Sequence, residues 1–190
     1  MTAIAERPTI DRTAATAPRE VVAPVETRRE KLTRYALAGL RLALGWTFLW
    51  AFLDKTFGLG HETEAAKAWI NGGSPTRGFL GNAVAGPFAD FYQGFAGAAW
   101  ADWLFMIGLA AIGTALMLGV GMRIATATGA LLLVLMWTAV LPPANNPFMD
   151  DHLIYAGLLG VLALTAAGDT LGLGRYWTRL ALVRRLPFLK

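Results

Sequence analysis

The chain has 190 residues, 55% of them hydrophobic and 16% charged, and its mean hydropathy of +0.46 is too high for an ordinary soluble domain. It contains no cysteine and only two histidines, which excludes thiolate-bound metals, iron–sulfur clusters and disulfides and argues against a bis-histidine haem or a zinc site. The net charge of +4 and the pI of about 9.8 do not indicate a nucleic-acid-binding protein, because the basic residues follow a membrane topology rather than one stripe.

Two polar segments flank the apolar part of the chain. Residues 1–32 are rich in alanine, threonine, proline, arginine and glutamate and have no apolar periodicity. Such a segment cannot bury enough apolar surface to offset the entropy lost on ordering, so we expect a disordered tail. Residues 179–190 form a shorter basic tail after the last apolar run.

Four apolar runs predict four membrane-spanning helices. Each has about 20 residues, enough to cross roughly 30 Å of hydrocarbon at about 1.5 Å per residue. Three residues separate the second run from the third, which predicts a tight hairpin. We therefore expect an all-α membrane protein, a four-transmembrane-helix bundle within residues 33–178, with spans at about 35–57, 101–120, 124–141 and 153–173.

The distribution of lysine and arginine predicts the orientation of this bundle. One face has only Lys55, Lys67 and Arg77. Positive charge accumulates on the cytoplasmic side of a membrane, so both termini are expected in the cytoplasm of a bacterial cell, with the protein in the plasma (inner) membrane. The residues on the basic face are Arg7, Arg12, Arg19, Arg28, Arg29, Lys31, Arg34, Arg123, Arg175, Arg179, Arg184, Arg185 and Lys190.

A long loop, residues 58–100, joins the first two spans on the extracytoplasmic side. A bare connection of this length is unusual in a compact bundle, so the loop is expected to have its own structure. Residues 62–70 predict a short helix, and residues 79–100 are semi-apolar, with several aromatic side chains. Such a segment either lies on the membrane surface or caps the bundle.

Polar side chains gather between the third and fourth spans in LPPANNPFMDDHLIY, residues 141–155, which we call the hinge. Asp151, His152 and Tyr155 are spaced to lie on one side of the helix that begins here. A histidine beside a carboxylate can exchange protons and a phenol can orient a bound oxygen, which makes His152 and Asp151 the candidate catalytic residues. The alternative is structural: the aspartates cap the helix, Tyr155 is an interfacial aromatic, and Asn146 forms a turn instead of binding a ligand.

The first span ends at the same face with two further candidates. Lys55 either binds an anion or places its ammonium group at the interface. Trp50, one turn after Trp46, either stacks on a flat ligand such as a quinone ring or packs within the bundle.

Two features near the cytoplasmic ends of the spans predict structure. Arg41 lies about two turns inside the first span and needs a partner, and Asp169 in the fourth span is the expected one, as a structural ion pair. The second and fourth spans end in similar glycine-rich sequences, LGVGMR and LGLGR. These indicate either an ancient duplication or two glycine-rich helix ends, each followed by an interfacial arginine.

Five sequence features occur together within residues 33–180: Arg41…Gly45, Lys55, Leu118-Gly-x-Gly-x-Arg, Asn146-Pro147…Asp151-His152…Tyr155 and Gly172-x-Gly-Arg-Tyr-Trp. Together they resemble the DoxX/DoxD family of bacterial membrane proteins. The DoxD branch is the membrane subunit of a thiosulfate:quinone oxidoreductase, whose smaller DoxA component has no counterpart in this sequence. The resemblance implies quinone or substrate contacts at Lys55, Asn146, Asp151, His152 and Tyr155.

The sequence thus leads to two main functional hypotheses. In the first, the chain is the membrane subunit of a quinone-linked oxidoreductase of the thiosulfate:quinone type, with noncovalently bound quinone and without haem, iron–sulfur or zinc. In the second, it is a non-catalytic membrane scaffold or assembly partner of a redox or stress complex. A third, a small-solute transporter, ranks last, because transporters usually bind near the bilayer midplane and the interiors of the spans lack polar groups apart from Arg41. The expected partners are the lipid bilayer, a DoxA-like or other redox protein and a second copy of the chain, and nucleic acid is not expected.

Overall fold

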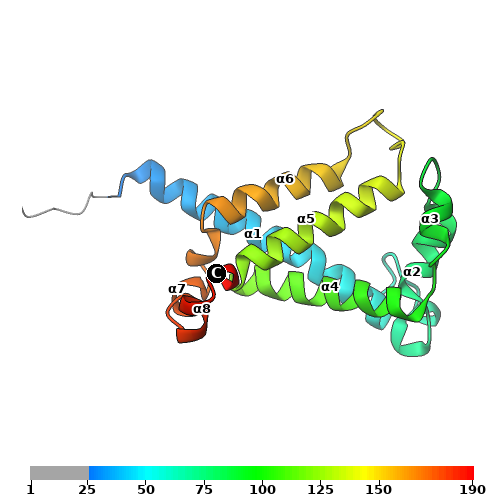
Figure 1. Ribbon diagram of the computed structural model, residues 1–190, viewed down its shortest axis with the longest axis horizontal. Coiled ribbons are helices and arrows are strands. Elements are labelled where there is room, and N and C mark those ends of the chain that lie inside the picture. The colour runs from blue at the N-terminus through cyan, green and yellow to red at the C-terminus, as the bar shows by residue number, and fades with distance from the viewer. Residues whose placement is uncertain (1–25) are drawn as a thin grey trace, which may run out of the picture.

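The computed structural model describes residues 26–190, and every regular element in that part of the chain is a helix (Figure 1). Of the tail predicted to be disordered, residues 1–32, the first 25 residues lie outside the described residues, and residues 28–32 are helical instead. The first helix, α1, runs from Arg28 to Phe57 and so begins before the expected start of the span. Its start is fixed by a capping box, because Thr27 accepts from the Glu30 amide at 3.2 Å and its own amide donates to the Glu30 carboxylate at 2.8 Å.

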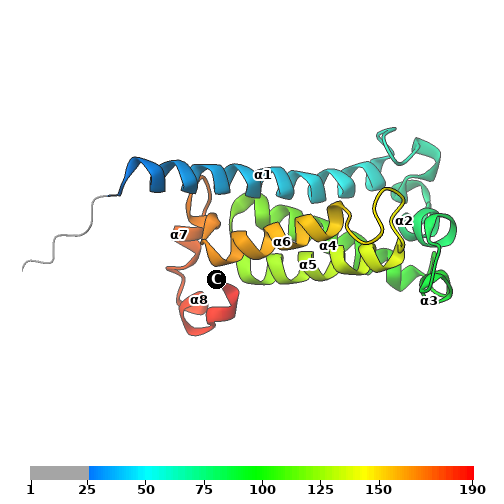
Figure 2. The ribbon, with the colours of Figure 1, turned by 90° about the horizontal axis from the view of Figure 1, so that it is seen from above.

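In the described part of the chain, three helices are long and apolar enough to cross a membrane: α1, α4 (Ala99–Leu118) and α5 (Met122–Ala139). α1 packs along α4, and α5 packs along α6 (Asp151–Leu164), so the four helices form one bundle (Figures 1 and 2). Its core contains Leu44, Phe48, Met106, Leu116, Leu159 and Leu162.

Glycine sets the spacing between α1 and α4. A Cβ atom on Gly113 would lie 2.7 Å from the backbone nitrogen of Leu49, and one on Gly45 would lie 3.0 Å from the Leu116 Cβ. The two backbones therefore approach more closely than side chains at these positions would allow, as small residues permit between apolar helices.

α6 is shorter than the predicted fourth span. It has 14 residues, ends at Leu164, and is followed by Ala166 in the left-handed region and by the short 3-10 helix η4 (Ala167–Asp169). The expected helix over residues 153–173 is therefore wrong in its second half, where the chain turns across the end of the bundle. The carbonyl groups freed by this turn have a partner in Arg41.

Arg41 is fully buried and donates hydrogen bonds to five backbone carbonyl oxygens. Two of them, Leu116 and Met117, belong to the last turn of α4, and the guanidinium bonds the latter at 3.0 Å. The other three lie beyond α6: Ala167 at 3.1 Å, Thr170 at 3.2 Å and Leu171 at 2.8 Å.

The expected ion pair between Arg41 and Asp169 is not among the salt bridges of residues 26–190. The physical reason is that carbonyl groups already take up the guanidinium donors. The α4 C-terminus is also the negative end of that helix dipole, so a cation is stabilised there without a carboxylate.

The remaining end carbonyls of α4 are also satisfied. The Ala115 oxygen accepts from the amides of Gly119 and Val120, at 2.8 and 3.1 Å, and the Leu118 oxygen accepts from Leu173 at 2.7 Å. The segment after α6 therefore closes the end of α4 together with Arg41.

The two glycine-rich motifs meet at this place. A Cβ on Gly119 would lie 2.6 Å from the Gly168 oxygen, and one on Gly172 would lie 2.5 Å from the same atom. The glycines let two backbone segments touch beside the guanidinium, which is a packing role for both motifs.

The long loop has its own structure and caps α5. It contains η1 (Ala65–Lys67), η2 (Trp69–Asn71), α2 (Pro75–Gly78), the π-helical turn η3 (Phe79–Ala83) and α3 (Ala89–Gln93), so two 3-10 turns replace the short helix expected over residues 62–70. Leu80, Val84 and Tyr92 form a second small core with Ala139 of α5. The Tyr92 hydroxyl lies 3.0 Å from the Leu135 oxygen, to which it donates.

The chain after α6 continues through α7 (Gly174–Trp177), α8 (Ala181–Arg185) and η5 (Pro187–Leu189), so the basic tail of residues 179–190 contains helical turns. These elements lie with the start of α1 and the α4–α5 turn at one end of the bundle, the basic end. The hinge and the long loop lie at the opposite end, the loop end (Figures 1 and 2). The C-terminal segment thus lies at the same end as the α4–α5 turn, and the hinge lies at the same end as the long loop, as expected from the sequence.

Arg41→Leu is expected to lower the free energy of unfolding by about 3 kcal/mol or more, because it leaves several buried carbonyl oxygens without donors. Arg41→Lys should lose a similar amount, since one ammonium group cannot reach carbonyls on separate segments. Asp169→Asn should cost much less. Thermal unfolding of the detergent-purified variants, followed by circular dichroism, gives the ranking, and a greater loss for Asp169→Asn than for Arg41→Leu would contradict this account.

Candidate functional site

His152 at the start of α6 forms a close pair with an aspartate. Its Nδ1 lies 2.7 Å from Oδ2 of Asp150, and the two side chains are 25% and 13% exposed. Asp150 also caps the helix, since its Oδ1 accepts from the Leu153 amide at 3.3 Å. The sequence predicted Asp151 as the partner. The extended backbone of the cap residue instead folds the Asp150 carboxylate back over the first turn, while Asp151 is exposed.

The other polar residues of the hinge mainly shape the loop. The Asn146 side-chain oxygen accepts from the amides of Phe148 and Met149, at 3.0 and 2.9 Å, which is the turn-forming role considered as the alternative. Trp137 of α5 ties the loop down by donating its indole N–H to the Phe148 oxygen at 2.8 Å. Tyr155, one turn into α6, is 38% exposed.

Lys55 and Trp50 belong to a separate cluster at the end of α1. The Lys55 ammonium lies 3.4 Å from the Glu62 carboxylate, and the Trp50 ring meets the His61 ring edge-on at 5.1 Å between centroids. Buried Asp54 anchors this cluster by accepting from three amides of the following loop, the closest being Thr63 at 2.9 Å. No hydrogen bond, ion pair or ring contact joins these side chains to His152 in residues 26–190.

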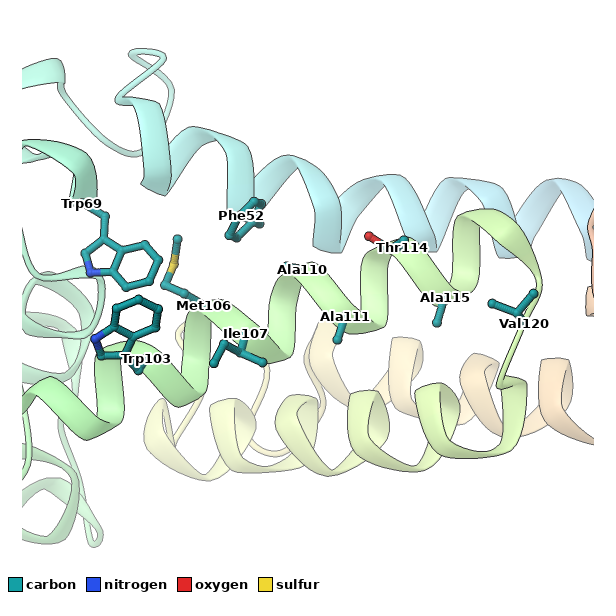
Figure 3. A pocket seen from close by; sticks show the side chains of 10 residues that line it. All are labelled: Phe52, Trp69, Trp103, Met106, Ile107, Ala110, Ala111, Thr114, Ala115 and Val120. Atoms are coloured by element: carbon teal, nitrogen blue, oxygen red, sulfur yellow. The ribbon is translucent and has the colours of Figure 1, made fainter. Parts of the chain in front are cut away.

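An open groove of about 590 Å³ runs along α4, with Phe52 of α1 and Trp69 of η2 at its side (Figure 3). At its loop end, Trp69 and Trp103 pack edge-to-face with ring centroids 4.7 Å apart. Figure 3 shows their six-membered rings facing Met106, with the indole nitrogens on the far side. The lining residues are Phe52, Trp69, Trp103, Met106, Ile107, Ala110, Ala111, Thr114, Ala115 and Val120.

Small side chains on one face of α4 form the floor of the groove. From Trp103 to Ala115 this face extends about 18 Å along the helix, at about 1.5 Å per residue. Thr114 is the one lining residue with a hydroxyl group, and no titratable side chain takes part. The groove can therefore hold a flat ring or a long apolar chain, whereas proton exchange needs groups from elsewhere.

Sequence reasoning missed the groove and chose Trp50 as the stacking aromatic. Trp103, Ala110, Ala111 and Thr114 fall on one helical face, a pattern that would have indicated a hollow beside an aromatic side chain. Trp69 lies in the long loop, and its meeting with Trp103 depends on tertiary folding, so the sequence carries no local signal for it.

Residues 26–190 are all-helical, with three helices long and apolar enough to cross a membrane, a half-buried histidine–aspartate pair and an apolar groove. Within residues 26–190, no three histidine, aspartate or glutamate side chains gather in a group that could hold a metal ion. Comparisons with protein-family models, curated proteins and solved structures give no match. The resemblance to the DoxX/DoxD family therefore remains a hypothesis based on the sequence motifs.

Asp150→Ala should reduce the free energy of unfolding by about 1 kcal/mol, the usual value of an N-cap, because it removes the acceptor for the Leu153 amide. Asp151→Ala, one position later and exposed, is the matched control and should have a smaller effect. Chemical denaturation of both variants in detergent measures the difference. If Asp151→Ala is the more destabilising, the assignment of the cap to Asp150 fails.

Proposed function

We propose that this protein is the membrane subunit of a quinone-linked oxidoreductase of the thiosulfate:quinone type. The observation that carries the proposal is the apolar groove along α4, a helix that is long and apolar enough to cross a membrane. Its length and small side chains suit the isoprenoid tail of a quinone, and the Trp69–Trp103 pair offers a stacking surface for the ring.

Reduction of a quinone to a quinol takes up two electrons and two protons. In the proposed reaction, two thiosulfate ions lose one electron each and join through a new sulfur–sulfur bond as tetrathionate, and a DoxA-like or other partner passes the two electrons to the bound quinone. His152 takes part in the proton transfer at the loop end. Its Nδ1 faces the Asp150 carboxylate, and Nε2 has no hydrogen-bond partner among residues 26–190.

The proposal assigns the basic end to the cytoplasm of a bacterial plasma membrane. Positive charge concentrated at the start of α1, the α4–α5 turn and the C-terminal segment supports this orientation. The loop end, with His152, the Trp69–Trp103 pair and Lys55, then meets an extracytoplasmic donor.

Ala111→Phe is expected to lower the quinone content of the purified protein about five-fold or more, because the added ring occupies the groove where a ligand would lie; five-fold corresponds to about 1 kcal/mol of binding. Leu104→Phe adds a ring to the same helix outside the groove lining and is the control. Quinone extracted into organic solvent and quantified per mole of protein gives the comparison. Equal quinone content in the two variants and the wild type would refute the groove as the quinone site.

His152→Ala is expected to slow thiosulfate-dependent reduction of decylubiquinone by roughly 100-fold while leaving the quinone content unchanged, as expected for a residue that moves protons. His61→Ala, the other histidine at the loop end, is the control and should react at nearly the wild-type rate. The assay uses membranes containing the full chain and its co-expressed partners. Equal rates for the two variants would exclude His152 from the reaction, and the absence of both bound quinone and quinone reduction in the folded wild type would reject the proposed function.

The alternative function is a non-catalytic scaffold of a redox or stress complex, and the surface of the long loop favours it. Phe91 and Trp100 are 66% and 60% exposed, and both rings contact Phe95, with centroids 5.5 and 5.3 Å apart. Exposed clustered aromatics are typical of protein or membrane contacts. Under this alternative, Phe91→Ser releases a co-purifying partner, while Ala111→Phe has no effect on the assembly.

A further inference from the structure

The C-terminal segment, residues 170–190, combines positive charge with exposed apolar side chains. It contains five basic residues and no acidic ones, and all five basic side chains are exposed: Arg175, Arg179, Arg184, Arg185 and Lys190. Between them, Tyr176 is 68% exposed, Leu182 62% and Phe188 56%. Large apolar side chains at this density on a charged surface indicate a contact with something that is itself both apolar and anionic.

This segment is held in a defined position against the bundle. The Arg123 amide at the start of α5 donates to the Lys190 oxygen at 2.8 Å, and its guanidinium donates to the Pro187 oxygen at 3.1 Å. The Trp177 indole N–H closes the segment on itself by donating to the Leu189 oxygen at 2.5 Å, and Val183 is buried. The exposed leucines therefore belong to a folded segment with a fixed position on the bundle.

The segment also lies at the level where a membrane surface would be. Figure 2 shows α7 and α8 running across the basic end, beside the α4–α5 turn, rather than along the bundle. If α4 and α5 cross the bilayer, this direction places the segment in the plane of the interface. Helical segments in that plane insert apolar side chains into the acyl boundary while their arginines meet lipid phosphates.

We propose that residues 170–190 form an in-plane binding surface for anionic phospholipids at the basic end. Leu180, Leu182 and Phe188 enter the acyl boundary, and Arg184 and Arg185 bind the phosphate groups. Charge complementarity and exposed apolar side chains together favour a lipid surface over nucleic acid, which would use the arginines and leave the leucines in water. The proposal does not depend on quinone chemistry.

The test compares the full chain in nanodiscs of phosphatidylcholine with and without phosphatidylglycerol, by hydrogen–deuterium exchange of residues 170–190. Phosphatidylglycerol should slow exchange in this segment about ten-fold, and high salt should reverse the effect. The double variant Arg184→Gln with Arg185→Gln should lose most of this protection. The matched control, Arg28→Gln with Arg29→Gln, removes an exposed pair at the same end of the bundle and should keep it.

Three results would overturn the proposal. One is equal exchange of the wild type in the two lipid compositions. This comparison uses the wild type alone, so it does not depend on whether a variant folds. Another is an equal loss of protection in the two double variants, which would show a response to total charge only. The last is protection by a short added RNA but not by phosphatidylglycerol, which would assign the surface to nucleic acid.

Discussion

The buried guanidinium of Arg41 is the interaction on which the rest of the structure depends. An unpaired charge in an apolar bundle is very costly, and here five carbonyl oxygens compensate it. Two come from the end of α4 and three from the chain beyond α6, so one side chain joins three parts of the fold. The chain turns after α6, and this turn brings three of the acceptors to the guanidinium.

The sequence predicted the need for a partner of Arg41 but not its identity. An arginine inside an apolar run signals burial, whereas backbone carbonyls are present at every residue and leave no mark in a sequence. The same limit explains the error in the fourth span. Residues 165–173 are largely apolar, which predicts the end of a helix. Asp169 and the glycines Gly168 and Gly172, which let the backbone approach Gly119 and Arg41, distinguish them from one.

The candidate site shows a similar division. The hinge was located correctly at one end of the bundle because charge and helix breakers are local signals, and the role of Asn146 in a turn was among the alternatives. Which of Asp150 and Asp151 pairs with His152 depends on the geometry of the helix cap. Two adjacent aspartates look alike in the sequence, so the sequence does not predict which one it is. The groove depends on the contact between Trp69 and Trp103, which are some thirty positions apart in the sequence. Hydrophobic periodicity does not predict a contact at that separation.

The four helices differ in length, and this has a mechanical consequence for the surrounding membrane. α6, with 14 residues, rises about 21 Å, while a typical hydrocarbon layer is roughly 30 Å thick and α4, with 20 residues, matches it. If α6 and α4 cross the same bilayer, as the proposed function requires, this mismatch compresses the lipids beside α6 and leaves those beside α4 relaxed. In that arrangement the protein imposes a thickness gradient around its circumference, which favours short-chain or disordered lipids on a single side.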